Sequence, residues 1–284
     1  MSSKSLQNQA PQKEVLLSAH FSVRYAGKPP VLCDVQMEIQ RGEVLGLVGQ
    51  SGSGKSTLAM AILGLLDKKR SHAEGTIRFQ DSDLLQLSER ELRALRGKAV
   101  ALVLQSPLSS LNPALKIRTQ LKEAWRAHAA CTSTDCANAI QASLQSVSLP
   151  ANDDFLRKYP SQMSVGQAQR VLIAMAVMHR PALLIADEAT SALDVITQSE
   201  ILALFRELNR STGMAILYIS HDLASVAGIC DRIAILHQGE IVECGVTERI
   251  FSNPQHEYTQ RLMAAIPRLL PLNSQLQMKT AAAR

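Results

Sequence analysis

Short apolar runs alternate with longer amphipathic stretches along most of this 284-residue chain. Two amphipathic stretches, 57–66 and 200–209, repeat their apolar residues with the spacing of one helix face. Four apolar runs have the length of buried strands: 43–48 (EVLGLV), 99–104 (AVALVL), 182–186 and 215–220. Strands that alternate with helices predict an α/β fold in which helices cover both faces of a mainly parallel sheet.

Three regions depart from this alternation. Residues 15–39 and 76–79 are strand-like and predict an N-terminal antiparallel β part, and residues 232–242 predict a hairpin that turns near Gly239. From about 106 to 180 helical patterns broken by prolines replace the strand pattern. This change predicts a helical subdomain inserted into the sheet-containing core.

Composition and charge narrow the function classes. Hydrophobic residues make up 46% of the chain, enough for a well-buried core. The net charge of +5 arises from 30 basic and 25 acidic residues, and the densest basic cluster, 68–70, is short. A nucleic-acid binder concentrates its basic residues more strongly, so we expect no nucleic-acid partner. Five scattered cysteines without a CxxC pair predict neither a zinc site nor a disulfide framework, and are typical of a reducing cytoplasm.

The sequence predicts neither a membrane span nor a signal peptide. Its longest apolar run, 171–178, is far shorter than the roughly 20 residues of a spanning helix. The polar segment 1–14 lacks the apolar centre of a signal peptide. We therefore expect that the chain does not cross a membrane by itself, and that its weakly patterned tail after Pro267 is loosely ordered.

The strongest chemical signal is a phosphate-binding loop. A segment that fits G-x-x-x-x-G-K-[ST] lies between a predicted buried strand and a predicted helix. Its glycines let successive N–H groups point at one anion, and the helix N-terminus adds the positive end of its dipole. Lys55 would contact the β- and γ-phosphates, and the Ser56 hydroxyl would ligate Mg²⁺. The loop consists of Gly49, Gln50, Ser51, Gly52, Ser53, Gly54, Lys55, Ser56 and Thr57.

A second signal, Asp187-Glu188, follows the predicted strand 182–186. Carboxylates at the C-terminal tip of a parallel strand face the ligand crevice of an open α/β sheet. Asp187 is therefore a candidate to hold Mg²⁺, directly or through water, and Glu188 to polarise the attacking water. An isolated Asp-Glu pair is most often a surface loop, but the apolar run before it and the phosphate loop favour the functional interpretation.

With these motifs in this order, the chain resembles the ATPase subunits of ABC transporters over residues 15–267. The resemblance implies ATP and Mg²⁺ as cofactors, and Lys55, Glu188 and His221 as catalytic residues of ATP hydrolysis. Taken singly, an aromatic residue, a strand-end glutamine or a histidine has an ordinary structural explanation, so the ordered set carries the resemblance. The matching positions are Tyr25 (stacking on adenine), Gln105 (contacting Mg²⁺), Ser164, Gly166 and Gln167 of the signature motif 163–167 (contacting the partner subunit's ATP), the partner-contacting loop 191–194, and His221 (sensing the γ-phosphate).

The same resemblance implies a nucleotide-binding domain over 15–250, with its helical subdomain over about 106–180, and a C-terminal family motif and tail over 251–284. It also implies partners: a second ATPase subunit, two permease subunits and a periplasmic or extracellular solute-binding protein. The chain would then lie peripherally at the cytoplasmic face of the inner membrane.

Two segments, 109–113 (SSLNP) and 254–260 (PQHEYTQ), look like those of the oligopeptide, dipeptide and nickel uptake group. This implies an importer for peptides or for nickel and other metal chelates. Longer peptide members carry a cysteine-rich C-terminal extension, and no cysteine follows Cys244, which tilts the expectation toward the nickel type. The alternative is a soluble ABC-type ATPase that serves a non-transport complex, as in carbon–phosphorus lyase.

Two positions depart from the family pattern. Val165 replaces the first of the paired signature glycines, and Ala189 follows Glu188 where the family has proline. A β-branched residue restricts the close approach that glycine allows. We therefore expect a partner ATPase that is a different chain, with unequal hydrolysis at the two composite ATP sites.

Overall fold

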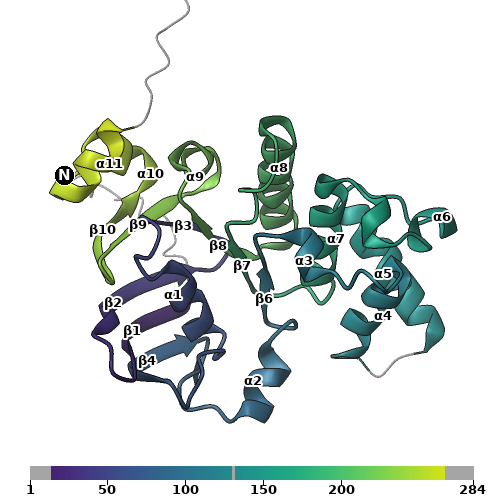
Figure 1. Ribbon diagram of the computed structural model, residues 1–284, viewed down its shortest axis with the longest axis horizontal. Coiled ribbons are helices and arrows are strands. Elements are labelled where there is room, and N and C mark those ends of the chain that lie inside the picture. The colour runs from purple at the N-terminus through teal and green to yellow at the C-terminus, as the bar shows by residue number, and fades with distance from the viewer. Residues whose placement is uncertain (1–13, 130–131, 266–284) are drawn as a thin grey trace, which may run out of the picture.

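Two β-sheets and a group of helices make up the part of the chain that the computed structural model describes, residues 14–129 and 132–265. The first sheet is antiparallel, with strand order β2-β1-β4-β5, and lies at the lower left of Figure 1. The second has the order β10-β9-β3-β8-β7-β6, and its pairings are parallel apart from that of β10 with β9. The α/β fold with a mainly parallel sheet and an N-terminal antiparallel β part is thus confirmed.

The strands follow the predicted apolar runs closely. The run over 215–220 is a strand with those bounds, and the predicted hairpin turns between β9 and β10. The short strand predicted over 76–79 is longer, because it pairs with β1 along its whole length. The strands are β1 (Val15–Tyr25), β2 (Pro30–Gln40), β3 (Val44–Val48), β4 (Ser71–Phe79), β5 (Ser82–Asp83), β6 (Val100–Val103), β7 (Leu183–Asp187), β8 (Ala215–Ser220), β9 (Arg232–His237) and β10 (Glu240–Val246).

The six-stranded sheet separates two hydrophobic cores. Successive side chains of a strand point to opposite faces. In β3, Leu45 and Leu47 pack with the antiparallel sheet and α1 (Lys55–Ile62), whereas Val44 and Val48 pack in the other core. That other core holds α8 (Val195–Thr212), α9 (Leu223–Ile229) and the helices of the inserted segment. A parallel sheet covered on both faces results, as the continuous apolar strands predict.

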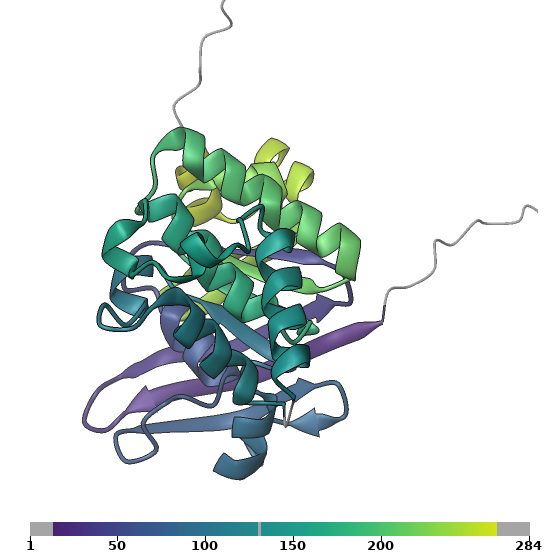
Figure 2. The same ribbon diagram turned by 90° about the vertical axis from the view of Figure 1, so that its right-hand side faces the viewer.

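The segment between β6 and β7 is helical, as predicted. It forms the right-hand part of Figure 1 and faces the viewer in Figure 2. A proline occupies the first position of α3 and of the 3₁₀ helix η1, where its missing N–H costs nothing. The helices are α3 (Pro107–Ser110), α4 (Ile117–Arg126), α5 (Ser133–Ser146), α6 (Asp153–Leu156), η1 (Pro160–Gln162) and α7 (Val165–Val177).

The helix predicted over 57–66 has different bounds. It is α1, which begins at Lys55, inside the phosphate-loop motif, with Gly54 as its N-cap. It ends earlier than predicted because Gly64 takes a left-handed conformation (φ 61°). The helix over 89–95, α2 (Glu89–Leu95), begins with the capping box that Ser88 and Glu91 form.

The helix predicted over 200–209 is longer at both ends. It is α8, and its N-cap Asp194 accepts hydrogen bonds from the backbone N–H groups of Ile196 and Thr197. Its C-cap, Gly213, has a φ of 70°, a left-handed conformation that ends many helices. The apolar pattern marked the buried middle of this helix, and the caps mark its ends.

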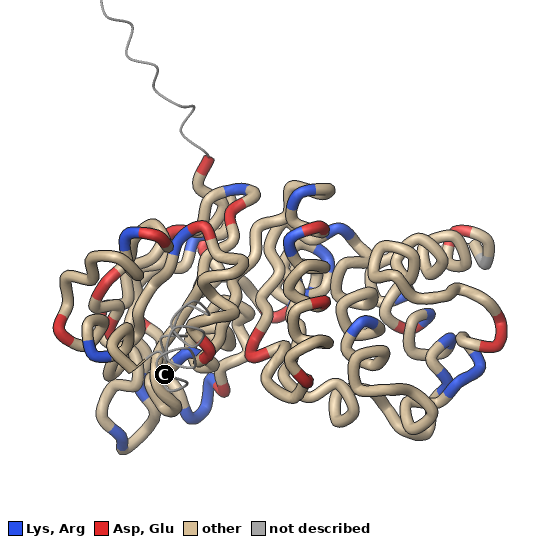
Figure 3. Tube along the Cα trace, turned by 90° about the horizontal axis from the view of Figure 1, so that it is seen from above, with Lys and Arg blue, Asp and Glu red and all other residues tan. Residues whose placement is uncertain are grey.

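Three short helices were not predicted: α9, α10 (Thr247–Ser252) and α11 (Glu257–Ala264). None of the helices in the described ranges is long and apolar enough to cross a membrane. Basic and acidic residues are interspersed over the described chain (Figure 3). The tail after Pro267 lies outside the described residues.

Candidate functional site

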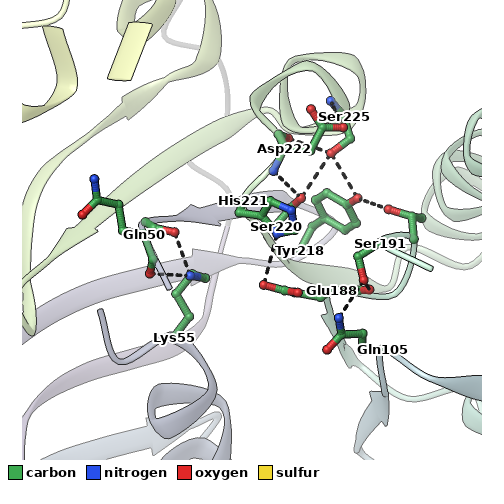
Figure 4. Close-up of polar contacts among 12 residues, drawn as sticks. Gln50, Lys55, Gln105, Glu188, Ser191, Tyr218, Ser220, His221, Asp222 and Ser225 are labelled. Carbon is green, nitrogen blue, oxygen red and sulfur yellow. Dashed lines mark hydrogen bonds and ion pairs between the residues drawn. The ribbon is translucent and has the colours of Figure 1, made fainter. Parts of the chain in front are cut away.

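The phosphate loop runs from the end of β3 into the first turn of α1, and Lys55 is the first residue of that helix. Its ammonium group donates hydrogen bonds to the carbonyl oxygens of Gly49, at 2.7 Å, and Gln50, at 2.9 Å (Figure 4). Burial lowers the pKa of Lys55, while the carboxylates of Glu188 and Asp187 act in the opposite direction. The loop thus holds one cation at its centre, next to two acids from another strand.

Glycine is required at particular loop positions. A Cβ on Gly49 would lie 2.3 Å from the Leu236 carbonyl oxygen, because the end of β9 presses against the loop. Gly54 has a φ of 108°, and a Cβ there would lie 2.6 Å from the Leu32 side chain. Only glycine combines this backbone conformation with this packing. The tight curl that presents N–H groups to an anion therefore depends on these two residues.

Asp187 ends β7 with a carboxylate that has an unfilled hydrogen-bonding position. Its Oδ1 is buried and has no hydrogen-bond partner among the described residues. Burial raises the pKa of Asp187, and a hydrogen bond from the Ser56 hydroxyl opposes that rise. A buried carboxylate oxygen beside a hydroxyl is a donor set that suits Mg²⁺, a hard cation that prefers oxygen ligands. The residues present therefore fit the predicted metal.

Glu188 and His221 meet at the ends of neighbouring strands. Nδ1 of His221 lies 3.2 Å from Oε1 of Glu188 (Figure 4). The pairing follows from the topology, because β7 and β8 are adjacent and parallel. Glu188 also has a left-handed backbone conformation, with a φ of 49°, which is uncommon for a non-glycine residue. Such strained residues cluster at active sites, where the surrounding structure holds them in place.

A hydrogen-bonded chain joins Gln105 to the backbone of Glu188. Gln105 follows β6, and its amide donates to the Ser191 hydroxyl at 2.9 Å. That hydroxyl donates to the Glu188 carbonyl oxygen at 3.0 Å. Next to this chain, the buried Tyr218 hydroxyl lies 2.9 Å from Thr190 Oγ1, and Figure 4 shows Tyr218 beside Ser191. Gln105 therefore contacts the loop that carries the acid, a contact that its sequence position did not reveal.

The remaining predicted residues lie on other elements of the fold. Tyr25 ends β1 and is half-buried against the core of the antiparallel sheet. Ser164 and Gln167 form a capping box at the start of α7, with the Gln167 N–H donating to Ser164 Oγ at 3.2 Å. A Cβ on Gly166 would lie 2.7 Å from Thr197 Cγ2, so this end of α7 abuts the start of α8. The signature motif thus belongs to the helical subdomain, where α7 begins (Figure 1), and its Val165 side chain is exposed.

One loop contact has no counterpart in the sequence analysis. The Tyr258 hydroxyl accepts a hydrogen bond from the Gln50 N–H at 3.3 Å, across 208 residues of sequence. Tyr258 belongs to the segment 254–260, which had indicated only the subfamily. No local pattern could have shown which residue Tyr258 contacts. The only signal in the sequence was an aromatic residue in a short amphipathic stretch.

Comparisons with known proteins agree with this geometry. Residues 32–191 match the family model of the ABC transporter, and residues 242–283 match that of the oligopeptide/dipeptide transporter, C-terminal region. The chain is 39% identical to the dipeptide transport ATP-binding protein DppD of Bacillus subtilis, over 86% of this chain and 73% of that protein. It is 44% identical to the peptidoglycan transport ATP-binding protein YejF of Agrobacterium fabrum, over 84% of this chain and 44% of the relative.

A third relative and a solved structure extend the likeness. The glutathione import ATP-binding protein GsiA of Salmonella typhimurium is 40% identical over 83% of this chain and 39% of its own length. The chain thus spans less than half of YejF and GsiA. The dimeric ATP-binding cassette MJ0796, bound to ADP and Pi, superposes with a TM-score of 0.70 at 27% identity, over 81% of this chain and 98% of MJ0796. The chain therefore belongs to the ATP-binding proteins of the ABC transporter family, in its oligopeptide/dipeptide group.

Proposed function

We propose that this chain is the ATP-hydrolysing subunit of an ABC importer for peptides. The observation that carries the proposal is the convergence of Lys55, Asp187, Glu188 and His221 at the carboxyl ends of three parallel strands. Dipeptide and glutathione transport in the names of the relatives supports a peptide cargo. These names lend no support to the tilt toward nickel in the sequence, and peptides are therefore preferred over metal chelates.

Each residue of the site has a separate role in ATP hydrolysis. Lys55 and the N–H groups of the loop neutralise charge on the β- and γ-phosphates of ATP. Ser56 and Asp187 hold Mg²⁺, which when bound supplies further neutralisation of the phosphate charge. Glu188 orients the attacking water and takes up its proton, and His221 holds the Glu188 carboxylate and contacts the γ-phosphate. Gln105 positions the loop of Glu188 through Ser191.

Tyr25 stacks on the adenine ring in this proposal. Ser164, Gly166 and Gln167 contribute to the ATP site of a second ATPase subunit, because they lie on the helical side, away from the phosphate loop of their own chain. The dimer in which MJ0796 was solved supports this arrangement. Val165 in place of glycine favours a second subunit that is a different chain, with two unequal ATP sites.

Two permease subunits and a solute-binding protein complete the proposed importer. The nucleotide-binding domain comprises 15–250 and the C-terminal part 251–284, and the helical subdomain passes its movement to the permeases. The chain lies at the cytoplasmic face of the membrane through those permeases. The names of the relatives as transport and import proteins support this assignment.

The decisive experiment is affinity purification of the tagged chain from solubilised membranes, with identification of the proteins that come with it. Two permeases and a second ATPase are expected, and the complex should hydrolyse ATP when a peptide-loaded binding protein is added. Lys55→Ala is the matched variant, which should leave the complex assembled but inactive. Recovery with a soluble enzyme complex and no membrane protein would overturn the transporter assignment.

A further inference from the structure

The C-terminal segment folds back against the phosphate loop. Tyr258, the second residue of α11, is 4% exposed, and its hydroxyl accepts the Gln50 N–H at 3.3 Å. Its ring stacks on that of His237 at the end of β9, with centroids 3.7 Å apart and planes 20° apart. The neighbouring Leu236 carbonyl is the group that excludes a side chain from Gly49. The end of β9 and Tyr258 thus form one wall behind the loop.

This wall and Lys55 hold opposite ends of the same peptide unit. The peptide between Gly49 and Gln50 donates its N–H to the Tyr258 hydroxyl and presents its carbonyl to the Lys55 ammonium at 2.7 Å. A peptide group is planar, so fixing its N–H fixes the direction of its carbonyl. The Tyr258 contact therefore constrains the plane against which Lys55 is positioned.

The segment that carries Tyr258 is itself anchored to the sheet. The Glu243 carboxylate of β10 accepts the N–H groups of Gln255, at 2.8 Å, and His256, at 3.0 Å. His256 Nδ1 then accepts the Tyr258 N–H at 3.1 Å and caps α11. Hydrogen bonds to a carboxylate are stronger than those between neutral groups. The segment that carries Tyr258 is thus held to β10 by hydrogen bonds at the point where Tyr258 contacts the loop.

We propose that Tyr258 is a positioning residue for the phosphate loop: through its hydroxyl and its stack on His237, the C-terminal segment sets the affinity of the chain for ATP. This inference rests on the proposed function, since it takes ATP as the ligand of the loop. Glu188 and His221 follow β7 and β8, and in the described part of the chain neither is hydrogen-bonded to Tyr258 or Gln50. We therefore expect loss of the Tyr258 contact to weaken ATP binding more than it lowers the rate at saturating ATP.

The test uses Tyr258→Phe, which removes the hydroxyl and keeps the ring, in the full chain and in the assembled complex. Loss of one neutral hydrogen bond predicts a rise in the Kd and KM for ATP of about three- to tenfold, larger than any change in kcat. Tyr159→Phe, at an exposed tyrosine of the helical segment, is the matched control and should change neither constant. A fall in kcat with an unchanged Kd would overturn the proposal.

A second readout separates this inference from the proposed function. Amide hydrogen exchange at Gln50 in the nucleotide-free chain should be faster in Tyr258→Phe than in the wild type and the control. His237→Ala should speed exchange and weaken ATP binding in the same way, whereas His237→Phe keeps an aromatic ring for the stack and should restore both. Unchanged exchange at Gln50, or faster exchange with an unchanged Kd for ATP, would refute the positioning role of Tyr258. Failure of wild-type chain to bind ATP would refute the proposed function, with the exchange measurement still valid.

Discussion

The His221 imidazole contacts the Glu188 carboxylate, with Nδ1 and Oε1 3.2 Å apart, although 33 residues separate them in the sequence. Each side chain follows the C-terminal end of a strand, and the two strands are parallel neighbours. The histidine ring is the more exposed of the two, at 60% against 23% for the glutamate side chain. The acid is therefore held at the crevice by a residue that can also reach a ligand above it.

Replacement of Glu188 by glutamine should remove most ATP hydrolysis and leave ATP binding intact. The amide keeps the size of the side chain but cannot take a proton from water, and removal of such a base costs about 10²- to 10⁴-fold in rate. The measurements are phosphate release by the assembled complex and equilibrium ATP binding. Glu207→Gln, at an exposed acid on α8, is the control. Near-normal turnover of Glu188→Gln would show that another group activates the water.

Replacement of Asp187 by asparagine should stabilise the nucleotide-free protein at pH 7. Burial raises the pKa of Asp187, so its contribution to stability is complete below the unfolded-state pKa and is lost as the pH rises through the folded-state value. A neutral amide avoids the unfavourable burial of the charged carboxylate. Thermal unfolding should therefore show a higher Tm for Asp187→Asn than for wild type.

The same variant should lose the metal-dependent part of its stabilisation by ATP. The added stability from Mg²⁺-ATP over ATP alone, seen as a rise in Tm in the wild type, should shrink because a ligand oxygen with its charge is gone. Asp81→Asn, in an exposed turn, should change neither quantity. An undiminished Mg²⁺ effect would contradict the assignment of Asp187 as a metal ligand, and a lower Tm without nucleotide would contradict the unfavourable burial of its charge.

Two glycine-to-alanine substitutions should have opposite effects. Gly49→Ala places a Cβ 2.3 Å from the Leu236 carbonyl, so backbone must move, at a cost of about 1–3 kcal/mol in the free energy of unfolding. Gly228→Ala, in α9, meets nothing within 4 Å and should stabilise by about 0.5–1 kcal/mol through helix propensity. Urea unfolding measures both. Equal stability of the two variants would show that the loop tolerates a side chain beside β9.

Restoring glycine at position 165 should equalise the two ATP sites of the proposed complex. Val165 is the first residue of α7 and is exposed, so Val165→Gly removes little packing. Hydrolysis at each site is measured with the other phosphate loop inactivated by a lysine-to-alanine change. The wild-type complex should show unequal rates, and the variant should raise the slower one. Equal rates in the wild type would refute the inequality.

Much of the sheet was predictable because its strands are buried on both sides. The run 215–220 is buried throughout and apolar up to Ser220, and its ends coincide with those of β8. The middle of α8 was equally clear from Ile201, Leu204 and Leu208, but its ends depend on Asp194 and Gly213, which lie outside the apolar pattern. The short helix α11 was missed, because eight residues give too few turns for a reliable period.

Only part of the candidate site could likewise be predicted from the sequence. The phosphate loop and the Asp187-Glu188 pair could be predicted because their chemistry lies in contiguous residues. The contact of Gln105 with Ser191 and that of Tyr258 with Gln50 could not, since each joins segments that only the fold brings together. The adenine-stacking role of Tyr25 and the partner-facing roles of Ser164, Gly166 and Gln167 stay predictions.

The central sheet also divides the buried side chains into two groups that pack independently of each other. The helix that follows the phosphate loop is packed entirely in one core, and the helices of the inserted segment are packed in the other. A substitution among the inserted helices changes the packing of its own core, and the sheet lies between that core and α1. Damage by substitutions on the two sides should accordingly add without coupling, since distant sites that share no contacts are energetically independent.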